Sequence, residues 1–220
     1  MKKKLQVLSI SLALTSAASI LHAEGNINAG KQKATSCAGC HGEDGNSMVA
    51  TFPKLAHQHS SYLQQQLHAF KDGTRSDPMM SAIAMTLADE DIQDISAYYA
   101  AQKVSENSLP VSVADEDEKP AGTNDAVQSL ITQGSNLYRN GNLQSAVSAC
   151  IACHGPFGEG NKPALFPALK SQHADYLIKA LTDFKSGARS NNPENIMHMI
   201  AKKMSDQEIK AVSYRISMMK

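Results

Sequence analysis

The chain has 220 residues, enough for one large or two small domains, and it carries 21 basic and 21 acidic side chains. This balanced charge lacks the positive excess of a nucleic-acid-binding surface, so no nucleic-acid partner is expected. Only 5% of the residues are aromatic and none is tryptophan, which would leave two independent domains of this size with thin hydrophobic cores.

The first 23 residues have the three parts of an export signal. Lysines at 2–4 precede an apolar run at 5–20, and Leu-His-Ala at 21–23 offers a small residue at the cut. We expect cleavage after Ala23, although Leu21 is larger than the small residue preferred at the third position before the cut. An uncleaved anchor is the alternative, but the run is short for a span of about 20 apolar residues. The mature protein is therefore expected to be soluble and exported to the periplasm.

The sequence C-x-x-C-H occurs twice and uses every cysteine of the chain. It is the attachment signature of a c-type haem, in which two thiols add to the porphyrin vinyl groups and the imidazole binds the iron. Positions three and four apart share one face of a helix, so all three side chains can face one flat ring. We expect two covalently attached haem c groups, which would also fill the thin cores. The attachment residues are Cys37, Cys40, Cys150 and Cys153, and the proximal ligands are His41 and His154.

Other uses of these cysteines fit the sequence less well. A zinc site needs a second thiol pair or imidazoles at zinc spacing near each pair, and none is obvious. A thioredoxin-like redox pair sits near a βαβ pattern, and no strand-rich region is present. Two disulfides would leave the histidine after each second cysteine without a reason. Haem attachment is the interpretation that accounts for the whole motif.

The duplication extends well beyond this motif. At an offset of 114 residues, Phe-Pro at 52–53, Gln-His at 58–59 and the segment 70–76 all return, and after a three-residue insertion near Asn192 the offset becomes 117. Two copies predict a tandem of one small domain rather than a solenoid. Prolines and the acidic run 115–118 mark a linker between them. The predicted division is a signal peptide at 1–23, domains at 24–103 and 125–220, and an acidic linker at 104–124.

Each copy is predicted to be all-α, because helical apolar spacing recurs and strand signals are nearly absent. The middle helices stop at Gly73 and Gly187. A capping box at Ser205 begins the last helix of the second copy. The first copy has Ala88 at the equivalent position, so its helix is expected to have a weaker cap or to use Thr86 as the cap. In the first copy the expected helices run from Ile27 to Cys37, over 62–70 and after Leu87. In the second copy they run over 129–149, with an irregularity at Gly141 as an alternative, over 176–184 and after Met204.

The sixth iron ligand should occupy equivalent positions in both copies, and two pairs qualify: Met80 with Met197, and His59 with His173. A methionine pair would give closed sites of raised potential that suit electron transfer, and a histidine pair closed sites of lower potential. The histidines follow the Phe-Pro bend directly, which leaves little chain to reach the other haem face, so we favour the methionines, with Met79 as an alternative to Met80. The histidines would instead start a helix or contact a propionate. The proline carbonyl at each bend could accept the Nδ1–H of the proximal histidine.

Together these motifs resemble the dihaem cytochrome c4 family over essentially all of the mature chain. The shared features are C-x-x-C-H, F-P-x-L, Q-H-x-x-Y-L, F-K-x-G-x-R and a methionine before the last helix, each present twice. The resemblance implies two class I cytochrome c folds related by a pseudo-twofold axis, with the haem edges facing across the interface. It implies the ligand pairs His41 with Met80 and His154 with Met197. Departures are Ala88, Ala168 in place of Lys54, and the acidic linker.

The expected function is periplasmic electron transfer rather than catalysis. The resemblance implies a soluble or loosely membrane-associated carrier that serves a terminal oxidase, and a quinol-oxidising complex or small carriers are further partners. A dihaem peroxidase or sulfur-compound oxidoreductase is the rival, as is a non-catalytic redox subunit. Residues 24–103 carry 6 basic and 9 acidic side chains, and residues 125–220 carry 11 and 7. Because positive surroundings disfavour ferric iron, we expect the second haem to have the higher potential.

Overall fold

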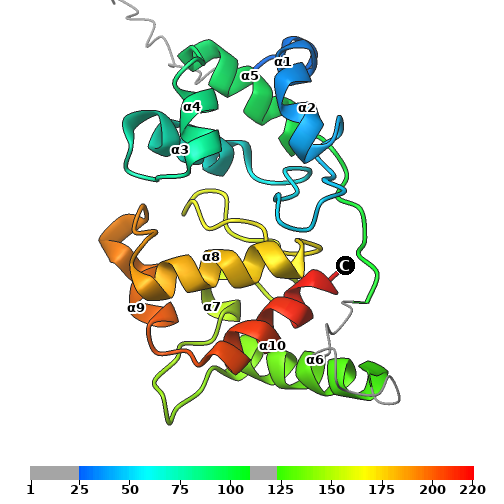
Figure 1. Cartoon of the computed structure of the whole chain (residues 1–220), viewed down its shortest axis with the longest axis vertical. Helices are drawn as coiled ribbons and strands as arrows, with labels where there is room; N and C mark the ends of the chain where they lie inside the picture. Colours follow the sequence, from blue (N-terminus) through cyan, green and yellow to red (C-terminus); the bar gives the residue numbers. More distant parts are fainter. Residues whose placement is uncertain (1–24, 110–122) are drawn as a thin grey trace, which may run out of the picture.

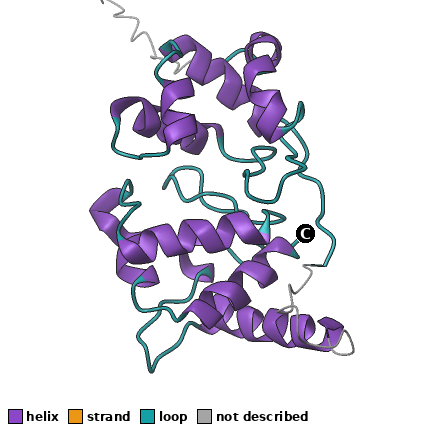
Figure 2. Ribbon diagram, viewed as in Figure 1, coloured by secondary structure: helices purple, strands orange, loops and turns teal. Residues whose placement is uncertain are grey.

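The computed structural model describes residues 25–109 and 123–220, which form two helical units stacked along the long axis of the molecule (Figure 1). Within these ranges the chain consists of helices and loops (Figure 2), and the only β-structure in them is two isolated β-bridges. The predicted all-α class is confirmed. No helix in the described ranges is long and apolar enough to cross a membrane. The predicted signal peptide and the acidic run 115–118 lie outside these residues.

The N-terminal unit is organised around the crossing of its first and last helices. Gly30 lies at the crossing, where a Cβ would stand 2.0 Å from the carbonyl oxygen of Asp94. Only glycine allows this approach of two helix backbones. Its helices are α1 (Ile27–Lys33), α2 (Thr35–His41), α3 (Ser60–Asp72), α4 (Pro78–Ala84) and α5 (Asp89–Ala100).

The C-terminal unit repeats this crossing. A Cβ on Gly134 would stand 2.0 Å from the carbonyl oxygen of Ala211. Gly134 follows Gly30 by 104 residues, whereas Cys150 follows Cys37 by 113, so nine residues are inserted between the crossing and the second haem motif. The helices are α6 (Thr123–Asn140), α7 (Ile151–His154), α8 (Ala174–Ser186), the 3-10 turn η1 (Pro193–Asn195), α9 (Ile196–Ala201) and α10 (Asp206–Ser217).

Two helix predictions are wrong in their extent. The helix expected from Ile27 to Cys37 is divided at Ala34, whose ψ of −2° departs from helical geometry and redirects the chain into α2. The helix expected over 129–149 begins earlier, at Thr123, and stops at Asn140, because Gly141 adopts a left-handed φ of 68°. The inserted residues that follow close into a turn in which Asn142 and Val147 exchange two backbone hydrogen bonds of 2.9 Å.

The predicted middle helices are confirmed as α3 and α8, each ending at a glycine in the left-handed conformation. The short helices α4 and α9, which carry the candidate methionines, were not predicted. Asp77 caps α4 by accepting the backbone N–H groups of Met79 and Met80 at 3.1 and 3.0 Å. In the second unit, Asn192 Oδ1 accepts the N–H of Met197 at 3.0 Å. A polar side chain therefore fixes the backbone of each candidate ligand.

The last helices differ in their caps as the sequence predicts. Ser205 Oγ accepts the N–H of Glu208 at 3.2 Å, and the Glu208 carboxylate accepts the N–H of Ser205 at 2.8 Å. Ala88 has no side-chain acceptor, and only the return bond is present, from its N–H to Asp91 at 2.9 Å. Thr86 does not replace the cap, since its hydroxyl donates to the carbonyl of Ile83.

The close helix crossings generate the first prediction. Gly30→Ala would force α1 and α5 apart, and overpacking of this kind costs about 1–3 kcal/mol or more of the free energy of unfolding. Gly134→Ala should have the same effect on α6 and α10. Asn28→Ala, on the exposed face of α1, is the control and should stay within about 0.5 kcal/mol. Denaturant unfolding of the haem-loaded protein measures the difference in the free energy of unfolding. Equal stability of Asn28→Ala and Gly30→Ala would contradict the requirement for glycine at the crossing.

Candidate functional site

The haem-binding cysteines lie on helical turns of both units. Cys37 and Cys40 are carried by α2, and Cys150 and Cys153 by the single turn of α7 and its N-cap. All four are free and half-buried. Burial raises the pKa of Cys37 and raises that of Cys150 to about 11, unlike the lowered pKa of redox-active thiols. In the described ranges no group of three or more His, Cys, Asp and Glu side chains could hold a metal ion, so neither a redox pair nor a zinc site has its expected surroundings.

The two proximal histidines have the same hydrogen bond in both units. His41 Nδ1 lies 2.9 Å from the carbonyl oxygen of Pro53, and His154 Nδ1 lies 3.0 Å from that of Pro167. Because a carbonyl can only accept, Nδ1 carries the proton and Nε2 keeps the lone pair that iron requires. Burial lowers the pKa of both rings, which favours neutral imidazole. The predicted proline contact is confirmed, and the residues present fit a histidine-ligated haem.

The candidate sixth ligands are placed differently from their rivals. Met80 and Met197 are half-buried in the first turns of α4 and α9, while Met79 is 50% exposed. His59 and His173 stand at the N-caps of α3 and α8. His173 Nε2 lies 2.9 Å from the carbonyl of Ser47 in the other unit, so this nitrogen carries a proton and donates. This bond argues against His173 as an iron ligand, and the assignment of the methionine pair stays a prediction.

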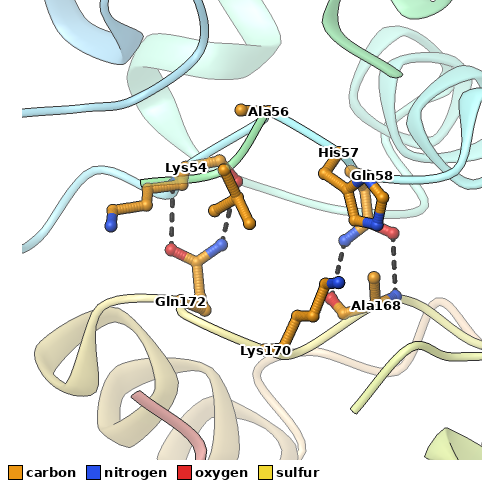
Figure 3. A pocket seen from close by; sticks show the side chains of 8 residues that line it. Lys54, Ala56, His57, Gln58, Ala168, Lys170 and Gln172 are labelled. Atoms are coloured by element: carbon orange, nitrogen blue, oxygen red, sulfur yellow. Dashed lines mark hydrogen bonds between the residues drawn. The ribbon is translucent and has the colours of Figure 1, made fainter. Parts of the chain in front are cut away.

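Two buried glutamines join the units at their interface (Figure 3). Gln58 Nε2 donates to the carbonyl of Ala168 at 2.9 Å, and its Oε1 accepts the N–H of Ala168 at 2.9 Å. Gln172 makes the same pair of bonds with the backbone of Lys54, at 2.9 and 2.8 Å. The two glutamines are 114 residues apart, and so are their partners. The interface therefore has the pseudo-twofold relation of the sequence repeat.

Lys54 breaks this symmetry, because the second unit has Ala168 in its place. Its buried ammonium donates to the Ser105 carbonyl and to Asn107 Oδ1, both at 2.7 Å. Asn107 in turn donates to the carbonyls of Ser171, Gln172 and Ser217 at 2.9 to 3.1 Å. The first residues of the predicted linker are therefore bound to both units.

Two arginines also meet at the interface, and in the described part of the chain neither pairs with a carboxylate. Arg189 donates to Tyr62 and Gln66 at 2.9 Å each. Arg75 donates to Gln66 at 2.8 Å and to Tyr176 at 3.3 Å. Each guanidinium lies over a phenylalanine ring of its own unit, 4.4 to 4.5 Å from the centroid.

The pKa of Tyr176 reflects the uncompensated charge of this cluster. Burial raises the pKa of the phenol, but the two guanidinium charges more than offset this effect and bring it to about 8. A buried site with two cations and neutral partners fits an anionic group. The propionates of two haems are groups of that kind, so the arginines are suited to hold them.

Sequence reasoning missed the role of the glutamines and arginines. Gln58, Gln172, Arg75 and Arg189 all belong to the repeated motifs. The available signal was that four polar residues recur at one offset without belonging to the iron site or to a cap. Their function depends on contacts between units, which motif spacing does not reveal.

Comparison with known proteins gives a consistent result. The cytochrome c family profile matches residues 27–102 and 131–217, once in each unit. Cytochrome c4 of Pseudomonas aeruginosa is 42% identical over 214 residues, which cover 97% of this chain and 96% of that protein. The crystal structure of reduced recombinant cytochrome c4 from Pseudomonas stutzeri has a TM-score of 0.79 at 37% identity, covering 89% of this chain and 100% of that one. A thiosulfate dehydrogenase electron acceptor of Stutzerimonas stutzeri is 36% identical over 181 residues, which cover 82% and 77% of the two chains.

The lysine that holds the linker generates the second prediction. Lys54→Leu keeps the apolar stem and removes the hydrogen bonds to residues 105 and 107, so residues 103–109 should exchange amide hydrogen faster. Hydrogen bonds to charged groups contribute about 1.5–3 kcal/mol each, and the free energy of unfolding of Lys54→Leu should fall by no more than the sum of two such bonds. Hydrogen exchange read by mass spectrometry measures the effect. Lys31→Leu, at an exposed position, is the control, and equal protection of 103–109 in both variants would contradict the anchoring role.

Proposed function

Because the chain belongs to the cytochrome c4 family of dihaem electron-transfer proteins, we propose that it carries single electrons between respiratory proteins in the periplasm. The observation that best supports this proposal is the identical arrangement at His41 and His154. In each unit a buried imidazole has its Nδ1–H bound to a proline carbonyl, and this histidine directly follows a C-x-x-C pair of half-buried thiols in the chain. Two such centres in one chain suit an electron carrier.

The residues of this chain hold the cofactor rather than a substrate. When bound, each haem c supplies an iron that cycles between the ferrous and ferric states. The four cysteines anchor the two haems, and Pro53 and Pro167 fix the orientation of the imidazoles that ligate them. Met80 and Met197 would complete the two ligand sets, and Arg75 and Arg189 would hold the propionates. With two protein ligands on each iron, the sites would be closed to small molecules, and electron transfer would be the reaction that they support.

The expected location and partners follow from the export signal and the relatives. Positions 1–23 direct the chain to the periplasm, where a quinol-oxidising complex or small carriers serve as donors and a terminal oxidase as acceptor. The relative named as a thiosulfate dehydrogenase electron acceptor adds a sulfur-oxidising enzyme as a second class of donor. The mature protein is soluble or loosely associated with the membrane.

The enzyme alternative has little support near the iron sites. A peroxidase or sulfur oxidoreductase needs an open iron and an acid–base group above it. His198, beside Met197, is the nearest candidate in sequence. Its Nδ1 lies 2.7 Å from the carbonyl of Phe184 and donates to it. This bond gives His198 a structural role in connecting α9 to α8.

The methionine assignment can be tested in the visible spectrum of the haem-loaded protein. Met80→Ala and Met197→Ala should each remove half of the weak far-red band from thioether-ligated ferric iron. Each should also let one ferrous iron bind carbon monoxide, which the unchanged protein should resist. Met79→Ala is the matched control and should leave both readouts unchanged. Loss of the band in Met79→Ala would transfer the assignment to that residue, and a full band in all three variants would overturn the methionine ligands and the closed-site mechanism.

The order of the potentials is a separate prediction. The C-terminal unit has 11 basic and 7 acidic residues, against 6 and 9 in residues 24–103, so its haem should be reduced first. Proton NMR during a redox titration of the full chain follows resonances of each haem separately. Earlier reduction of the haem attached at Cys37 and Cys40 would contradict the charge argument.

A further inference from the structure

The interface glutamines and the proximal histidines share a peptide group. The Pro53 carbonyl that binds His41 Nδ1 at 2.9 Å is one end of the peptide bond between Pro53 and Lys54. The N–H at the other end of this bond, on Lys54, donates to Gln172 Oε1 at 2.8 Å. One peptide therefore connects the first proximal histidine to a side chain of the C-terminal unit.

The second unit contains the pseudo-twofold counterpart of this chain of hydrogen bonds. His154 Nδ1 lies 3.0 Å from the Pro167 carbonyl, and the N–H of the same peptide, on Ala168, donates to Gln58 Oε1 at 2.9 Å. Each proximal histidine is thus connected to the glutamine of the opposite unit, and neither is connected in this way to its own.

The surroundings fix the orientation of each glutamine amide. Backbone N–H groups can only donate and carbonyls can only accept, so Oε1 must face the N–H and Nε2 the carbonyl. Oε1 also accepts the N–H of the next residue, His59 or His173, at 3.0 Å in both units. Both glutamines are only 8% exposed. The acceptor that faces each shared peptide is therefore held in place and shielded from water.

A peptide that donates through its N–H becomes a better acceptor at its carbonyl. Hydrogen bonds in such a chain strengthen one another by roughly 10–30% per bond, and low dielectric surroundings favour the effect. A stronger bond from Nδ1–H raises the basicity of a ligating imidazole. A more basic ligand stabilises ferric iron relative to ferrous iron and lowers the reduction potential.

We propose that Gln172 is a positioning residue for His41 and Gln58 for His154, so that each unit lowers the potential of the haem in the other. The inference rests on the proposed function, since it requires both histidines to ligate iron. Docking of the units thereby acts on both irons through two defined bonds. A glutamine that only holds the interface together would act on both haems alike or on the haem of its own unit.

The test is a pair of matched variants in the full haem-loaded chain, Gln172→Leu and Gln58→Leu. Gln172→Leu should raise the potential of the first haem, so that its ferric-to-ferrous ratio at fixed potential falls about threefold, equivalent to about 28 mV because tenfold is about 59 mV for one electron. The second haem should remain unchanged. Gln58→Leu should give the reverse pattern. Proton NMR redox titration reads each haem, and the Nδ1–H resonance of the affected histidine should move upfield.

A second pair keeps the test decisive where the leucine variants do not fold. Gln172→Glu and Gln58→Glu retain an acceptor oxygen with added charge, so each should lower the potential of the opposite haem more than that of its own unit. Equal shifts, larger shifts in the same unit or no shifts would overturn the proposal. Failure of the proposed function would appear differently, as the absence of two low-spin histidine–methionine centres from the unchanged protein.

Discussion

The structure depends on one requirement, that a fixed carbonyl holds the Nδ1–H of each proximal imidazole and leaves its Nε2 available for the predicted iron. Pro53 and Pro167 meet it from loops that leave the haem motif and return to the histidine 12 and 13 residues later. The same loops then supply the glutamines that face the other unit. The bonds that orient the proximal histidines and the docking of the two units therefore involve the same short segments, which explains why the Phe-Pro and Gln-His motifs recur together.

Features with local causes could be predicted from the sequence. The haem motif, the glycine stops of α3 and α8, the capping box at Ser205 and the proline carbonyl all depend on spacings within a few residues or one loop. Features that depend on contacts between segments far apart in the sequence could not be predicted. The crossings at Gly30 and Gly134 join opposite ends of each unit, and the nine inserted residues before Cys150 hide their correspondence. The sequence marks Gly141 as an alternative break, but apolar residues continue past it and favour the longer helix; its left-handed backbone ends α6.

The interface is symmetric in the contacts of its two glutamines and asymmetric in several other side chains. Gln66 accepts from Arg75, Arg189 and Asn191 at 2.8 to 2.9 Å, whereas the second unit has Ala180 at the position 114 residues later. Both guanidiniums are thus oriented by an amide of the N-terminal unit. Lys54, opposite Ala168, is another asymmetric position. The two haem environments differ where the units meet, although the bonds to their proximal histidines are the same.

The reciprocal glutamine contacts have the self-complementary form of an isologous dimer interface, in which each partner returns the contact that it receives. A single unit with this surface would pair with a second copy of itself only at sufficient concentration. Here the two halves belong to one chain, so docking becomes intramolecular and insensitive to dilution, and residues 105 and 107 add hydrogen bonds to the docked units. Two redox centres consequently reach every partner together, as a fixed pair rather than an equilibrium mixture of single and paired haems.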